Sequence, residues 1–129
     1  MTEQVTTPGI DQTAVIQSYI EAIRSGDLEK CMEFYADDAV LYFMTGVFRG
    51  KKSIEDWHRD RFKANFEIVK VDGIRSKADV VTLDASVTSS RLKTWKINRL
   101  GSRANFKMDQ GKIREAKFAP RIQNATDRG

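Results

Sequence analysis

Three residues in this sequence suit proton transfer or the stabilisation of negative charge. His58 is the only histidine, and the ordinary pKa of an imidazole, about 6.5, suits a general acid or base near neutral pH. Tyr19 carries a phenol O–H, which can donate a hydrogen bond to a carbonyl or to a developing oxyanion. Asp84 would form an oriented acid–base pair with His58 if its side chain turned toward that ring. These residues are the candidate catalytic groups.

Each candidate also has a purely structural interpretation. His58 lies either toward the interior or at the polar edge of its helix, where water would satisfy it. Tyr19 has aliphatic helical neighbours and is therefore buried, so its hydroxyl needs a partner, which is either a ligand or another polar group of the core. Asp84 shares strand parity with Ser86, and this parity favours an outward, solvated position.

Three helical segments are expected to position these groups. Apolar residues recur at helical spacing from Asp11 until Ser25-Gly26 ends the pattern. Asp27 then stands where an N-cap belongs, and a short second helix follows that Asp37-Asp38 is expected to end. A third amphipathic helix begins at Lys51. The helices therefore occupy the first half of the chain.

Segments rich in β-branched and aromatic residues predict strands. They are Ala39 to Met44, Phe66 to Ile74, Asp79 to Ser89, Leu92 to Met108 and Lys112 to Ile122. Turns are predicted at residues 46–50, 75–78 and 109–111. Gly101 interrupts the longest strand and marks either a tight hairpin or, as we favour, a bulge. The pattern predicts an α+β domain with three helices packed in a strongly curved, mainly antiparallel sheet.

Length and composition favour one domain. The 129 residues, 40% of them hydrophobic, suffice for a single core. We expect this domain to span residues 10–122, with a polar arm at 1–9 and a tail at 123–129. No apolar run is long enough to span a membrane and no signal peptide is evident, so we expect a cytoplasmic protein without a membrane partner. The single cysteine, Cys31, excludes an internal disulfide.

The net charge of +4 is unevenly distributed, because the excess of Lys and Arg lies after residue 90. Such a basic region can attract an acidic protein or a nucleic acid. The sequence contains no RNA-binding aromatic motif and no helix-turn-helix pattern, so we do not expect a nucleic-acid partner and favour a solvated or interface-facing sheet surface. Without a glycine-rich phosphate loop or a His/Cys cluster, neither a metal nor another cofactor is expected.

Three stretches, YIEAIRSGDLEKCMEFYADDAVLYF, GVFRGKKSIEDWHRDRF and MDQGKIREAKF, resemble the SnoaL-like branch of the nuclear transport factor 2 superfamily. The resemblance extends from Asp11 to Ile122. It implies a cone in which a curved sheet wraps around the helices, encloses a deep apolar pocket and forms a homodimer through its outer face. The branch includes polyketide cyclases and steroid isomerases, so the resemblance implies binding or transformation of a hydrophobic, aromatic or polycyclic metabolite.

The resemblance implies that some functional residues of the family have counterparts in this sequence and that others do not. Tyr19 matches the tyrosine that donates to the substrate carbonyl in the isomerases, and His58 matches a tyrosine of their pocket network. Phe43 stands where the isomerases carry their carboxylate base, and it cannot accept a proton. Arg103 corresponds to a second donor if the chains align without gaps, and it faces either the pocket or the basic sheet surface. The polyketide cyclases of the branch carry an acidic residue late in the final strand. This sequence has Ala119, Pro120 and Arg121 there.

The resemblance also implies a pocket wall. It is formed by Leu41, Phe43, Trp57, Phe62, Ala116 and Phe118, with Arg103 as a further substrate-binding candidate. Alternatively, these side chains fill the cone and leave no cavity. Such an apolar wall suits a flat hydrophobic ligand. Three hypotheses therefore remain: an acid–base enzyme such as an isomerase, cyclase or dehydratase, a non-catalytic carrier or sensor, and an interaction module that uses a basic sheet face.

Overall fold

The computed structural model describes residues 11–121, so the expected arm at 1–9 and tail at 123–129 lie outside the described residues. The helices are α1 (Gln12–Arg24), α2 (Leu28–Glu33), α3 (Gly50–Lys63) and α4 (Ser90–Thr94). The strands are β2 (Tyr35–Phe43), β3 (Gly46–Arg49), β4 (Glu67–Lys77), β5 (Val80–Thr88), β6 (Leu100–Asp109) and β7 (Lys112–Pro120).

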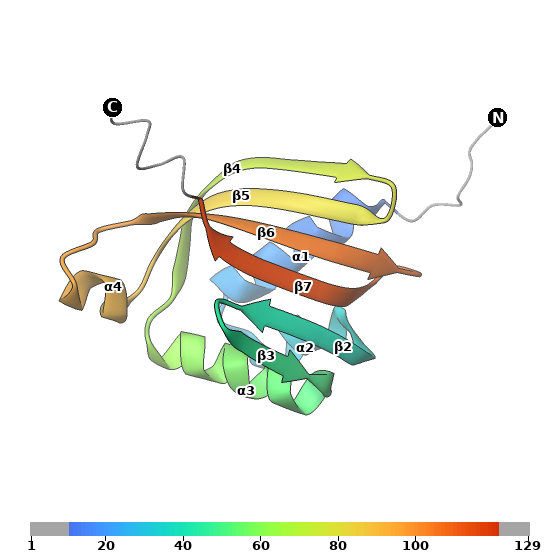
Figure 1. Ribbon diagram of the computed structural model, residues 1–129, viewed down its shortest axis with the longest axis horizontal. Helices are drawn as coiled ribbons and strands as arrows, with labels where there is room; N and C mark the ends of the chain where they lie inside the picture. The colour runs from blue at the N-terminus through green and yellow to red at the C-terminus, as the bar shows by residue number, and fades with distance from the viewer. Residues whose placement is uncertain (1–10, 122–129) are drawn as a thin grey trace.

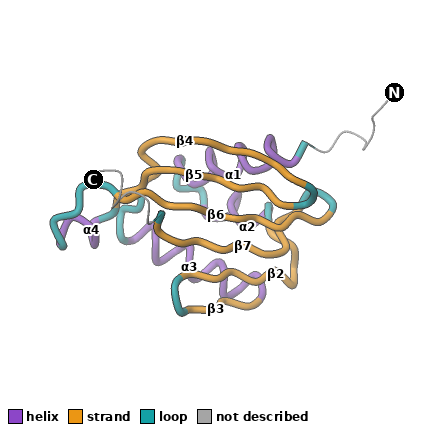
Figure 2. The backbone as a smooth tube through the Cα atoms, turned by 45° about the horizontal axis from the view of Figure 1, so that its top comes forward, coloured by secondary structure: helices purple, strands orange, loops and turns teal. Residues whose placement is uncertain are grey.

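The six strands form one sheet in the order β3-β2-β7-β6-β5-β4. The β2–β7 pair is parallel and the other pairs are antiparallel. Helices α1, α2 and α3 lie on one side of the curved sheet, whereas α4 stands apart at one end of it (Figure 1). The same arrangement is visible after rotation (Figure 2). The predicted α+β class and curved mixed sheet are confirmed.

The first two helices begin as the sequence predicts. The Asp11 carboxylate accepts hydrogen bonds from the backbone N–H groups of Thr13 and Ala14, at 3.0 and 3.3 Å. Asp27 accepts a bond of 3.0 Å from the backbone N–H of Lys30. Both aspartates therefore satisfy backbone donors that have no partner within the helix.

The prediction that Asp37-Asp38 ends the second helix is wrong. Helix α2 ends at Glu33, and both aspartates lie within β2, exposed to solvent. The ladder between β2 and β7 shifts register between Tyr35 and Val40, so this part of the strand is irregularly paired. The local turn preference of Asp is overridden because Tyr35 pairs with Ile113 and buries its ring.

The single long strand predicted from Leu92 to Met108 is also wrong. The segment forms helix α4, a loop, and then β6 from Leu100. Ser89 caps α4 by accepting a bond of 3.3 Å from the backbone N–H of Leu92. Gly101 pairs with Ser86 in an uninterrupted β5–β6 ladder, so it marks neither a bulge nor a hairpin.

The turn predicted at residues 109–111 is confirmed. Gln110 and Gly111 have φ values of 51° and 81°, which a tight hairpin turn between antiparallel strands requires. The turn between β4 and β5 is shorter than predicted, because β4 continues to Lys77. Part of the turn region predicted at 46–50 instead forms β3, which pairs with β2.

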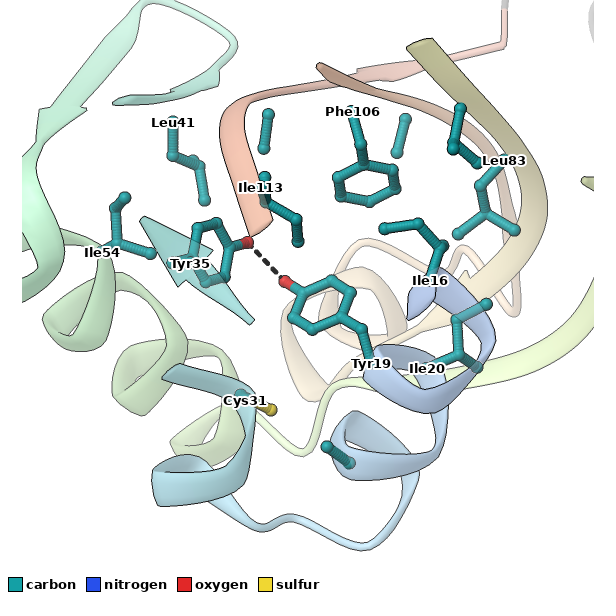
Figure 3. Close-up of a cluster of buried hydrophobic side chains, with 14 of the residues drawn as sticks. Ile16, Tyr19, Ile20, Cys31, Tyr35, Leu41, Ile54, Leu83, Phe106 and Ile113 are labelled. Carbon is teal, nitrogen blue, oxygen red and sulfur yellow. Dashed lines mark hydrogen bonds between the residues drawn. The ribbon is translucent and has the colours of Figure 1, made fainter. Parts of the chain in front are cut away.

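The core lies between the sheet and the three N-terminal helices. Figure 3 shows its centre, where the hydroxyls of Tyr19 and Tyr35 point toward one another among aliphatic side chains. Tyr19 and Phe106 are both fully buried, and their rings meet edge to face with centroids 5.7 Å apart.

Candidate functional site

A cavity of about 380 Å³ lies between the helices and the sheet, toward the end of the molecule where α4 stands. Its wall is drawn from α1, α3, α4, the inner positions of β5 to β7 and the connection before β6. Most of the lining is aliphatic or aromatic, and no Asp or Glu belongs to it among the described residues. The cavity therefore suits an apolar ligand of small-molecule size.

The expected pocket wall is found in part. Phe43, Trp57, Phe62 and Phe118 line the cavity, and the rings of Trp57 and Phe118 stack with centroids 5.2 Å apart. Leu41 and Ala116 are fully buried but belong to the solid core. They lie outside the cavity wall and do not face a ligand.

Tyr19 and His58 both adjoin the cavity, and the fold joins them in a chain of hydrogen bonds. Tyr19 Oη lies 2.7 Å from His58 Nε2 and 2.6 Å from Tyr35 Oη. His58 Nδ1 lies 2.8 Å from the backbone oxygen of Ile54. All three side chains are at most 2% exposed, so this polar chain is sealed beneath the cavity.

The donors in this chain follow from the backbone oxygen at its end. A carbonyl oxygen only accepts, so Nδ1 of His58 carries a proton and Nε2 of the neutral ring is an acceptor. Tyr19 must then donate its only proton to His58, and Tyr35 donates to Tyr19. Tyr19 therefore has no proton left for a ligand carbonyl while His58 is neutral, which differs from the donor role implied by the family resemblance.

Burial keeps the chain uncharged. It lowers the pKa of His58 to about 4, with a smaller contribution from the positive charge of Arg61. Burial likewise raises the pKa of Tyr19 well above its usual value, and the neighbouring Tyr35 adds to the effect. His58 is thus a neutral, weakly basic imidazole at physiological pH.

Asp84 and Arg103 lie outside the cavity and bind one another. Arg103 Nε and Nη2 donate to the two carboxylate oxygens of Asp84, at 2.7 and 3.0 Å, and Arg75 approaches at 3.4 Å. The neighbours of Asp84 along β5, Leu83 and Ala85, line the cavity, so Asp84 points to the other face of the sheet. The arrangements in which Asp84 pairs with His58 and Arg103 enters the pocket are therefore wrong.

The outer face of the sheet also carries opposite charges next to its basic residues. Asp84 neutralises Arg103, Asp72 binds Arg121 at 2.6 Å, and Lys117 lies 3.6 Å from Glu115. The Arg103–Asp84 pair lowers the pKa of the carboxyl by hydrogen bonding. These ion pairs reduce the positive potential expected for a basic interaction face.

Sequence reasoning missed the part of the wall between β5 and β6. Leu92 of α4 and the following Trp95, Ile97 and Leu100 line the cavity. The side chains of Trp95 and Ile97 remain 67% and 36% exposed, so this segment borders the opening. Ser89, a residue type preferred at helix N-caps, was the available signal for a helix start.

Two arginines also belong to the wall. Arg61 of α3 and Arg91 of α4 line the cavity and share the Asp60 carboxylate. The Arg61 guanidinium lies over the rings of Phe43 and Trp57, at 5.0 and 5.3 Å from their centroids. Nothing in the sequence indicated that Arg61 and Arg91 share one carboxylate.

Among residues 11–121, no group of three or more His, Cys, Asp or Glu side chains is placed to hold a metal ion. In the same range, no helix is both long and apolar enough to cross a membrane.

Comparison with known families agrees with this geometry. The SnoaL-like domain family matches residues 16–116, most of the chain. The chain belongs to this family. No curated protein sequence matches it significantly. Its resemblance to the SnoaL-like branch is thereby confirmed.

Solved structures similar to this SnoaL-like domain share its fold at low sequence identity. A cystatin-like-fold protein of unknown function from Xanthomonas campestris is 18% identical, with a TM-score of 0.76 and coverage of 91% of this chain and 95% of that one. A candidate polyketide cyclase from Sinorhizobium meliloti is 17% identical, with a TM-score of 0.73 and coverage of 82% and 94%. A candidate SnoaL-like polyketide cyclase from Shewanella denitrificans is 15% identical, with a TM-score of 0.71 and coverage of 90% and 94%.

Proposed function

We propose that this SnoaL-like domain binds a flat, apolar small molecule in its cavity and releases it chemically unchanged, as a carrier or sensor. The observation that carries the proposal is an apolar cavity without a described carboxylate in its wall. An apolar cavity of roughly 150 Å³ accommodates benzene, so about 380 Å³ suits a molecule of two or three fused rings.

The chemistry of the wall favours binding over turnover. General acid–base catalysis is most efficient when the pKa of the catalytic group lies near the working pH. The only uncharged imidazole in the wall, His58, has a pKa near 4 and already accepts the proton of Tyr19. Phe43, at the base position of the related isomerases, offers no replacement.

Binding can be tested with neutral aromatic alcohols of graded size. We expect isothermal titration calorimetry to detect saturable binding of 2-naphthylmethanol or 9-anthracenemethanol, and chromatography to recover the compound unchanged after incubation. Absence of binding for both compounds would count against the proposal. Steady formation of a product would replace the carrier function with a catalytic one.

Acid–base catalysis is the second candidate, and one observation favours it. The hydrogen-bonded chain from Tyr35 through Tyr19 to His58 ends beside the cavity and could pass a proton between the two tyrosines and the imidazole. If any substrate is turned over, a His58→Gln variant should lose that turnover. Undiminished turnover would remove His58 from the mechanism.

We also propose that the domain forms a homodimer through the outer face of its sheet. Support comes from the ion pairs there, such as Arg103 with Asp84, which reduce the charge repulsion between this face and the same face of a second copy. Sedimentation equilibrium should report twice the monomer mass. A monomer at all accessible concentrations would exclude the dimer.

A further inference from the structure

Two guanidinium groups from different helices meet at one carboxylate beside the cavity. Arg61 Nη2 donates to Asp60 Oδ2 at 2.5 Å, and Arg91 Nη2 lies 3.1 Å from each carboxylate oxygen of Asp60. The hydrogen bond from Arg61 is the main cause of the lowered pKa of Asp60, so this carboxylate is ionised. Two positive charges thus share one negative charge.

The remaining charge is not balanced within the wall. Asp60 itself does not line the cavity, whereas both arginines do, and the described lining contains no other carboxylate. The nearby Arg59 differs, because it is paired with both Glu55 and Asp56 on α3 and does not line the cavity. The part of the wall that Arg61 and Arg91 form therefore carries an excess positive charge, and it lies next to apolar surface.

The guanidinium of Arg61 is held in a fixed orientation that suits the binding of an anion. Its side chain is only 16% exposed and is packed over Phe43 and Trp57, which orient its guanidinium in the wall. A guanidinium has five N–H donors, and among the described residues Arg61 gives one nitrogen to Asp60. Arginine donors in a fixed plane are well suited to bind a carboxylate through two parallel hydrogen bonds.

We propose that the ligand is an amphipathic acid, whose aromatic or polycyclic part fills the cavity while its carboxylate binds Arg61 and Arg91 at the opening. This inference rests on the proposed binding function and specifies its ligand class. The acid replaces water around the two guanidinium groups and supplies the negative charge that Asp60 alone does not. The partly exposed Arg91 and Trp95 lie where the acidic end of such a ligand would remain near solvent.

A matched pair of ligands tests this inference separately from the binding function. Naphthalene-2-carboxylate and 2-naphthylmethanol share their ring system and differ in charge. We expect calorimetry in low salt to show that the acid binds about ten- to a hundredfold more tightly than the alcohol. Arg61→Gln and Arg91→Gln should each weaken the acid toward the affinity of the alcohol, by a larger factor than they weaken the alcohol itself. Arg59→Gln is the matched control and should change neither affinity.

The outcomes distinguish the two proposals. Equal affinities for acid and alcohol would overturn the acid specificity and leave the apolar-binding function standing. Failure of both compounds to bind would overturn both proposals. If Arg61→Gln and Arg91→Gln weakened the alcohol as strongly as the acid, the arginines would be structural supports of the wall, and the acid specificity would again be overturned.

Discussion

Tyr19 Oη lies 2.7 Å from Nε2 of His58, and the proton of this hydrogen bond belongs to the tyrosine. The assignment follows because His58 Nδ1 faces the backbone oxygen of Ile54, which can only accept. A neutral imidazole and two neutral phenols therefore form one buried chain with Tyr35 at its start. Its charge state governs both the stability of the domain and the chemistry available beside the cavity.

We expect the stability of the domain to fall between pH 7 and pH 5 because of His58. The pKa of His58 is lowered to about 4 in the folded state and is about 6.5 in the unfolded chain, so the unfolded state binds the additional proton first. The contribution is fully present above pH 6.5 and is lost as pH falls toward 4. It amounts to about 2 kcal/mol between pH 7 and pH 5.

Urea unfolding at the two pH values measures this effect. In His58→Gln the corresponding pH dependence should disappear, because glutamine does not titrate. An identical loss of stability between pH 7 and pH 5 in wild type and variant would show that other groups cause it.

Removing the Tyr19 hydroxyl should cost more stability than removing the Tyr35 hydroxyl. Tyr19→Phe leaves His58 Nε2 without its donor and the Tyr35 hydroxyl without its acceptor, whereas Tyr35→Phe leaves Tyr19 still bonded to His58. We expect about 1 kcal/mol for Tyr35→Phe and about 2 to 4 kcal/mol for Tyr19→Phe. Denaturant titration measures both, and equal costs would contradict the central position of Tyr19 in the hydrogen-bonded chain.

Filling the cavity should abolish binding without unfolding the protein. Ala104 lines the cavity, so the larger side chain of Ala104→Leu can occupy empty space, and we expect at least a tenfold loss of affinity for 2-naphthylmethanol. Ala116 is fully buried outside the cavity, and Ala116→Leu should cost about 1 to 3 kcal/mol by overpacking. Calorimetry and thermal unfolding check both variants. Unaltered affinity in Ala104→Leu would show that the ligand binds elsewhere.

Asp84→Asn should weaken the fold and leave ligand affinity unchanged. The substitution breaks the ion pair with Arg103, whose side chain is 39% exposed, so we expect a loss of about 1 kcal/mol. Asp84 lies on the outer face of the sheet and does not reach the cavity. A change in the affinity for 2-naphthylmethanol of more than about threefold, corresponding to roughly 0.6 kcal/mol, would contradict this separation.

Trp95 should report ligand binding through its fluorescence. It borders the cavity and is 67% exposed, whereas Trp57 is only 8% exposed in the wall. A ligand at the opening excludes water from the Trp95 indole, so its emission should shift to shorter wavelength. A non-fluorescent aliphatic ligand such as decanoate provides a clean signal, and Trp95→Phe should lose the shift. A shift that persists in this variant would place the ligand against Trp57 alone.

The local features of the fold were predictable because their signals lie within a few residues. Asp27 caps the second helix and Gln110-Gly111 forms a turn, as expected from residue type and spacing. The first helix begins beside Asp11, as its apolar periodicity predicts. Helix α4 was missed because its five residues are too few for a helical period to emerge within a strand-like segment. Asp37-Asp38 was assigned to a turn because a strand register shift has no local signature.

The candidate site was only partly predictable, because several of its contacts join residues that are far apart in the chain. Helical periodicity predicted that Tyr19 is buried but left His58 either toward the interior or at the polar edge of its helix. The apolar character of the wall followed from Phe43 and its neighbours. Whether Arg103 faced inward depended on the registry of β6, which the sequence left open between two alternatives. The ladder with β5 decides it by placing Arg103 opposite Asp84.

By itself, the sequence determined the class of fold, the family, the approximate starts of the first three helices and an apolar interior with few polar groups. Only the tertiary structure decided that Tyr19 donates to His58, that Asp84 binds Arg103 and that Arg61 meets Arg91 at one carboxylate. Residue type and periodicity act over a few neighbouring positions, whereas these contacts join elements that are far apart in the chain. Their partners are set by how the helices and strands pack together, and the pairing in turn sets which protons and charges reach the cavity.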